Sequence, residues 1–152
     1  MLTVERAIDL KDWEGKELGA SAWVEITQSD IDDFARITGD DNWIHVDVGR
    51  ARSDMPDGRT IAHGLFVLSL VPALQRQIFQ VRQRGRGFNY GYDRVRFISP
   101  VQVGRRVRVR QTLVEAGAHD KGTRLVIDAT IEIEGAERPA ILARNIVLIE
   151  DR

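Results

Sequence analysis

Cysteine is absent from the 152 residues. Without a thiol the chain can form no disulfide, no thiolate metal site and no cysteine nucleophile. An excess of one charge is also lacking, because 22 Lys and Arg face 23 Asp and Glu, for a formal net charge of −1. Since no basic field draws the protein to phosphate backbones or anionic lipid, we expect no nucleic-acid and no membrane partner.

Long apolar runs are missing as well. The longest, Leu65 to Leu74, is interrupted by Ser69 and Pro72 and is too short to span a bilayer. The N-terminal segment is charged and lacks the apolar stretch of a signal peptide. These absences predict a cytoplasmic protein. The length and a hydrophobic content of 43% predict one domain, residues 1–152.

The first half of the chain predicts a strand, a helix and a long loop. Residues 21–28 have the pattern of a strand. Apolar side chains at helical spacing predict a helix over 29–38, with Ser29 as its N-cap and Gly39 at its end. Residues 46–60 have no period, so we expect an excursion there with at most one short helical turn.

The second half predicts one long helix followed by a sheet. Residues 61–83 read as a single helix, apolar nearly all round at first, which Pro72 should kink or divide. Four alternating segments then predict strands, the last three an antiparallel meander: about 88–98, 105–116, 123–134 and 140–150. This order predicts an α+β architecture, the hot-dog fold, in which a curved antiparallel sheet wraps around a long central helix.

The segment TGDDNWIH, residues 38–45, gathers the side chains best suited to chemistry. Asp40 and His45 are two ionisable groups, and Ala62-His63-Gly64 opens the predicted helix. Together they could supply a general base, an acid partner and an oxyanion site. On spacing alone, a capped polar turn is the more frequent explanation of such a run.

GDDNWIHVDVGRA (39–51) closely resembles the hydratase 2 motif of the MaoC-like dehydratases, the (R)-specific enoyl-CoA hydratases. IAHGLF (61–66) resembles the start of their central helix, and the order of elements fits from about residue 20 to 150. NWIH and NYGYDRVRF (89–97) are most similar to the nodulation protein N-like branch. The resemblance implies a lyase of fatty acid metabolism that reversibly hydrates trans-2-enoyl thioesters to (R)-3-hydroxyacyl thioesters.

Residue roles follow from the same resemblance. It implies catalytic roles for Asp40 and His45, which hold a water, and for Gly64, whose N–H binds the thioester carbonyl. Asn42 matches the asparagine between the two catalytic positions. Trp43 stands where the family usually has proline, and this departure bears on substrate shape more than on chemistry.

Further substrate contacts are expected at His63, Phe66 and Arg96. For each of these residues a purely structural role is the alternative. His63 is favoured as a brace for the helix start. Phe66, like Trp43, lines an acyl pocket or is plain core. Arg96 belongs to an arginine-rich stretch that is either a solvated face or a site for coenzyme A phosphates.

No metal or organic cofactor is expected, because no two of the three histidines have ligand spacing. The expected partners are an acyl-CoA or acyl carrier protein thioester and a second copy of the chain, since a hot dog leaves sheet edges open. Two other functions remain open. One is a hot-dog thioesterase, and the other is a non-catalytic module that binds acyl thioesters.

Overall fold

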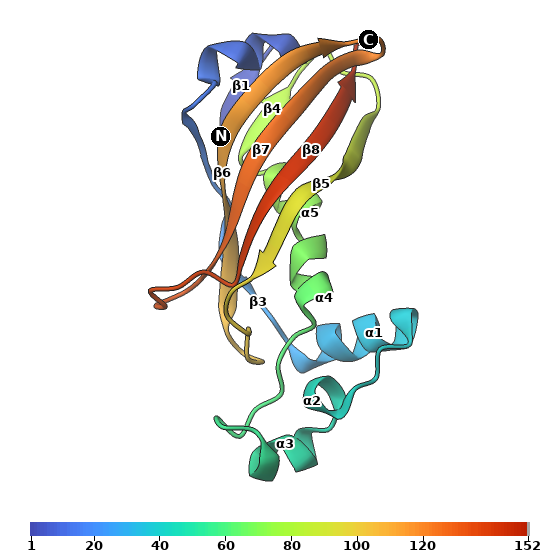
Figure 1. Ribbon diagram of the computed structural model, residues 1–152, viewed down its shortest axis with the longest axis vertical. Coiled ribbons are helices and arrows are strands. Elements are labelled where there is room, and N and C mark those ends of the chain that lie inside the picture. The colour runs from blue at the N-terminus through green and yellow to red at the C-terminus, as the bar shows by residue number, and fades with distance from the viewer. Residues whose placement is uncertain (152) are drawn as a thin grey trace.

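The computed structural model describes residues 1–151, and Figure 1 shows how they are arranged. Six strands form one sheet in the order β2-β6-β7-β8-β5, and β3 also pairs with β6. The strands are β2 (Glu17–Ala20), β3 (Val24–Glu25), β5 (Gly87–Phe97), β6 (Arg106–His119), β7 (Gly122–Ile133) and β8 (Ile141–Glu150). Every pairing in this sheet is antiparallel, which confirms the predicted meander and adds β5 at its edge.

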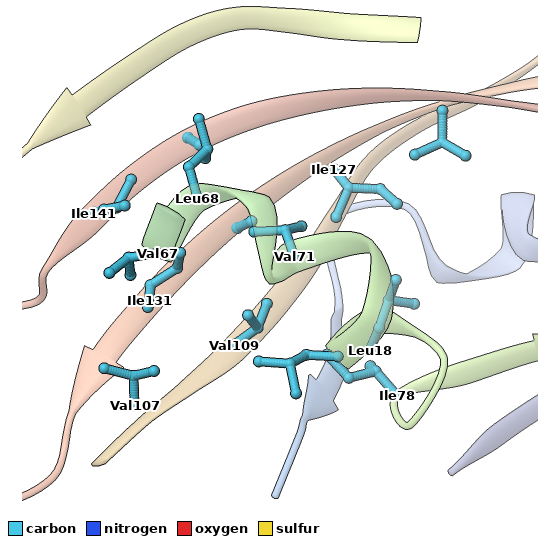
Figure 2. Close-up of a cluster of buried hydrophobic side chains, with 14 of the residues drawn as sticks. Leu18, Val67, Leu68, Val71, Ile78, Val107, Val109, Ile127, Ile131 and Ile141 are labelled. Carbon is cyan, nitrogen blue, oxygen red and sulfur yellow. The ribbon is translucent and has the colours of Figure 1, made fainter. Parts of the chain in front are cut away.

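The core lies between this sheet and two short helices, α4 (Gly64–Ser69) and α5 (Val71–Gln75). Val109, Ile131 and Ile141 face one another across three strands, and all three are buried. Figure 2 shows Val67 and Val71 of the helices packed toward this side of the sheet. Burying one such side chain contributes about 1.5–3 kcal/mol. The hot-dog arrangement expected from the sequence is therefore confirmed.

The helix predicted over residues 61–83 is wrong in both length and continuity. It begins at Gly64, breaks at Leu70 and ends at Gln75. Pro72 lies in the first turn of α5, where its missing N–H cannot bond to the turn before it, so the chain divides there. Beyond α5, residues 79–81 form strand β4 (Phe79–Val81) instead of a helical turn.

Strand β4 has a partner that the sequence did not suggest. It pairs in parallel with β1 (Leu2–Val4), in a separate two-stranded sheet. The 3-10 helix η1 (Ala7–Trp13) follows β1 and buries Leu10 completely. The strand predicted over 21–28 is also wrong in extent, because only the two residues of β3 are in the ladder.

Three helices gather at the opposite end of the molecule in Figure 1: α1 (Gln28–Thr38), α2 (Trp43–Val46) and α3 (Val48–Asp54). The N-cap of α1 is Thr27, whose hydroxyl accepts from the amide of Asp30, so the predicted cap at Ser29 is wrong. Gly39 ends α1 with φ 78, as predicted. The seven residues of α3 exceed the single helical turn predicted for this segment. Among residues 1–151, no helix is long and apolar enough to cross a membrane.

Candidate active site

His45 is fixed from two sides. It is 8% exposed, and its Nδ1 lies 2.6 Å from the carbonyl oxygen of Ile61. A carbonyl can only accept, so Nδ1 carries the hydrogen and, in the neutral ring, Nε2 keeps a free lone pair. The side-chain amide of Gln28 donates to the carbonyl of His45 at 2.8 Å. The backbone and the ring are both held, and one basic nitrogen remains available.

His63 joins the start of α4 to the segment that carries Asp40. Its Nε2 donates to the carbonyl of Asp40 at 2.8 Å. Its ring stacks on that of His45, with centroids 3.8 Å apart and planes 26° apart, and its other side meets Phe34. Nδ1 of His63 is buried and has no hydrogen-bond partner among the described residues. The bracing role expected for His63 agrees with these contacts.

The three side chains converge. A carboxylate oxygen of Asp40 and one ring nitrogen each of His45 and His63 all lie within 4.8 Å of one another. Asp40 itself is exposed, so its carboxylate is reached from solvent while the two rings are buried. One water molecule bound by two hydrogen bonds of about 2.8 Å could bridge the carboxylate and a ring.

The same cluster contains ligand types that zinc accepts, namely imidazole nitrogen and carboxylate oxygen. Histidine spacing in the sequence therefore does not exclude a metal, because the fold brings His45 and His63 together across 18 positions. One nitrogen of each ring is already hydrogen-bonded, which leaves Nε2 of His45 and Nδ1 of His63.

A cavity of about 400 Å³ opens beside His45. Its wall includes Gly64 at the start of α4, Phe97 at the end of β5 and Ile141 at the start of β8. Most of its other lining is apolar: Ile61, Ala62, Leu65, Val67, Ile98, Pro100, Val101 and Ala140. Gly64 has no room for a side chain, since an added Cβ would lie 2.6 Å from the Phe97 ring. The Phe97 ring therefore packs directly against the backbone at the start of the helix, in the wall of the cavity.

Comparison with known proteins shows the family of this chain. The family described as "MaoC like domain" matches residues 10–136. The chain belongs to this family. A 3-hydroxyacyl-thioester dehydratase Z of Mycobacterium tuberculosis is 45% identical over 97% of each chain. Nodulation protein N of Rhizobium leguminosarum bv. viciae is 43% identical over 90% of this chain and 86% of its own.

Solved structures agree on the fold of this MaoC-like protein. An (R)-hydratase of Pseudomonas aeruginosa superimposes with a TM-score of 0.72 over 87% of this chain and 79% of its own, at 20% identity. At that identity the likeness concerns the hot-dog fold alone. The resemblance of residues 39–51 and 61–66 to MaoC-like dehydratases is thus confirmed for the family as a whole.

The MaoC-like site does not bring every predicted residue to the cavity. His45 and Gly64 line it, and Asp40 lies beside the two rings. Asn42 caps α2, since its side chain accepts from the amide of Ile44. The predicted substrate contacts Asn42, Trp43, His63, Phe66 and Arg96 are not among the residues that line this cavity. Their roles in binding substrate stay predictions.

Three of these residues have other neighbours. Trp43 stacks under the guanidinium of Arg50, 4.0 Å from the ring centroid. Phe66 packs against Phe34, with ring centroids 5.6 Å apart. Arg96 is exposed, and its guanidinium donates to the carbonyl of Val95.

Sequence reasoning missed two residues that hold the MaoC-like site together. Gln28 was placed at the end of a strand, yet its amide bonds to the His45 carbonyl and its oxygen accepts from the buried hydroxyl of Thr60 at 2.5 Å. Gln28 is 17 residues from His45 and 32 from Thr60. No local pattern signals contacts over such separations.

Burial lowers the pKa of His45 below its ordinary value of 6.5, and nearby His63 lowers it further, while the Ile61 carbonyl and Asp40 oppose the shift. We therefore expect the acid limb of kcat/KM to lie below pH 6.5. An NMR titration of the His45 ring checks this, and a midpoint at or above 6.5 would contradict the burial. The lowered pKa also affects stability. As pH falls below 6.5, His45 is protonated in the unfolded chain before it is protonated in the folded protein, so the free energy of unfolding decreases.

Proposed function

We propose that the protein is a hydro-lyase that reversibly adds water to trans-2-enoyl thioesters and yields (R)-3-hydroxyacyl thioesters. The observation that carries the proposal is the convergence of the Asp40 carboxylate and the His45 ring next to an apolar cavity that also receives the first turn of α4. The relative that is 45% identical over nearly the full length is named a 3-hydroxyacyl-thioester dehydratase, which supports the same reaction here.

The water is activated between Asp40 and His45. Both groups can accept a hydrogen bond from this water. Nδ1 of His45 donates to the carbonyl of Ile61, so Nε2 is the nitrogen that accepts. A water that gives one hydrogen to each acceptor turns its oxygen lone pair toward the substrate. In hydration the C3–O bond forms, Asp40 takes one proton from the water, and the pair returns that proton to C2. Dehydration follows the same steps in reverse.

Gly64 supplies the third part of the site. As C3 is attacked, negative charge develops on the thioester oxygen. The amide at the first position of α4 has no intrahelical acceptor, and the helix start adds a partial positive charge. A donor of this kind typically contributes about 3–4 kcal/mol to transition-state stabilisation. Gly64 lines the cavity, so a thioester bound there can bring its carbonyl to that amide.

The function is tested by the loss of conjugated-thioester absorbance when trans-2-enoyl-CoA substrates of increasing chain length are added. We expect a decrease that stops at equilibrium, with (R)-3-hydroxyacyl-CoA as product and no free thiol. Thiol release from a saturated acyl-CoA would instead establish a thioesterase. Binding without any change in absorbance at any length would leave a non-catalytic binding module.

We also propose that two copies form a homodimer through β5. This strand is an edge of the sheet and exposes three aromatic side chains, those of Phe88, Tyr90 and Phe97. An unpaired edge of this kind favours pairing with a second copy. Sedimentation should give twice the mass of one chain at micromolar concentration, and Tyr90→Lys should shift the protein toward monomer, since Tyr90 is the most exposed of the three aromatic residues. A monomeric wild type would overturn the proposal.

A further inference from the structure

A second cavity lies farther along the β5–β8 pairing from the candidate active site. Its volume is about 200 Å³. Both cavities are bounded by the α4–α5 segment and by strands β5 and β8. The first adjoins Phe97 and Ile141, which face each other in the ladder, and the second adjoins Phe88, which faces Leu148 near the other end of the same pairing.

The second cavity carries uncompensated positive charge. Arg76 and Arg84 both line it. Of the nearby arginines, Arg82 pairs with Glu5 at 2.6 Å and Arg86 pairs with Glu150 at 2.8 Å. Within residues 1–151, no ion pair involves Arg76 or Arg84. Two exposed arginines thus line this cavity without a carboxylate partner.

Glycine gives one of these guanidinium groups its place. A Cβ added to Gly87 would collide with Nη2 of Arg84. The side chain of Arg84 therefore lies directly against the backbone at the start of β5. Any residue with a side chain at position 87 would displace it from the cavity wall.

Amide side chains add further donors. Gln111 is fully buried and donates to Oε1 of Gln75 at 2.9 Å, which leaves the NH2 group of Gln75 for the cavity. Asn145 is 2% exposed and donates to Oδ1 of Asn89 at 2.8 Å, which turns the NH2 group of Asn89 outward from that bond. The buried amides Gln111 and Asn145 thus fix the orientation of the Gln75 and Asn89 amides, and the NH2 group of Asn89 also donates to the Tyr92 hydroxyl at 3.5 Å. The cavity is consequently rich in donors, which suits a carboxylate or a phosphate.

We propose that Arg76 and Arg84, with Gln75 and Asn89, bind an anionic group carried by the thioester substrate at a distance from its reacting carbons. The inference rests on the proposed hydratase function, because it places one substrate across both cavities. Gly64 and Arg76 stand twelve positions apart. An unbroken helix would rise about 18 Å over that interval, and the break at Leu70 makes this an upper estimate. Only a long flexible arm spans that distance, either an acyl chain that ends in a carboxylate or the arm of coenzyme A that ends in phosphates.

The two sources are separated with three enoyl thioesters of one acyl length. The first joins an uncharged acyl chain to N-acetylcysteamine, which has no phosphate. The second adds a terminal carboxylate to that chain, and the third replaces N-acetylcysteamine with coenzyme A. We expect wild type to favour one of the two charged substrates in kcat/KM, and the Arg76→Gln/Arg84→Gln variant to lose that preference by at least about tenfold. Its turnover of the uncharged thioester should be unchanged.

Arg94→Gln is the matched control, because Arg94 is an exposed arginine of β5 that does not line this cavity. Calorimetric binding of coenzyme A and of a saturated dicarboxylate, measured in parallel, needs no turnover and so stands even if the hydratase proposal fails. Weaker binding of either anion by the double variant but not by Arg94→Gln supports the site. Equal preference and equal binding in wild type and double variant would overturn it.

Discussion

Replacing Asp40 by Asn is expected to lower kcat/KM for hydration by about 10²–10⁴-fold, the usual contribution of a positioned general base. An amide keeps the shape of the side chain but cannot take a proton from water. Because Asp40 is exposed and its carboxylate makes no hydrogen bond within residues 1–151, the melting temperature should stay within about 1 °C of wild type. The absorbance assay and thermal unfolding measure the two quantities.

The neighbouring Asp41 provides the matched control. It is also exposed, carries the same charge and stands one position away, yet it is not part of the cluster with the two histidines. Asp41→Asn should retain nearly all activity. Equal losses in the two variants would mean that the local negative charge matters and that Asp40 is not the base.

Gly64→Ala is expected to lower kcat/KM by about 100-fold, comparable to the loss of one oxyanion donor. The new Cβ would lie 2.6 Å from Cδ1 and Cε1 of Phe97, so the ring must move. Phe97 is 54% exposed within one copy of the chain, so moving its ring breaks few contacts inside that copy. The displaced ring, however, belongs to the cavity wall that the thioester must pass to reach the Gly64 amide.

Phe97→Ala separates the ring from the amide. Alone, it should widen the cavity and change kcat/KM by less than about tenfold, because it removes no polar partner. Combined with Gly64→Ala, it gives the new methyl group room and should restore most of the lost activity. A double variant as slow as Gly64→Ala would refute the account based on the displaced ring.

Patterns that depend on neighbouring residues predicted much of this structure. The alternation in residues 88–150 predicted four strands to within a few residues, and Gly39 marked the end of α1. The cap of α1 shows the limit of local patterns. Thr27 and Asp30 have the same spacing as Ser29 and Asp32, and the sequence alone does not decide between the two pairs.

Contacts between distant residues explain the remaining errors. Leu74, Ile78 and Val81 have the spacing of one helix face, but residues 79–81 become a strand because β1, at the other end of the sequence, supplies a partner. The sequence predicts only part of the cluster of Asp40, His45 and His63. The motif pairs Asp40 with His45, whereas the stacking of His63 on His45 requires the helix start to fold back beside α2. His63 therefore looked like a brace and not like a third member of the group.

The segment between His45 and Ile61 is held by hydrogen bonds at both of its ends. The amide of Ile61 donates to the carbonyl of Ile44 at 3.0 Å, the ring of His45 donates to the carbonyl of Ile61, and Gln28 bonds to both His45 and Thr60. These bonds set the distance between the ends of the intervening segment. The entropy of closing a loop grows only slowly with its length. Residues could thus be inserted in the turn after α3, residues 55–58, without moving the histidine, so the reacting groups tolerate changes in the length of this segment.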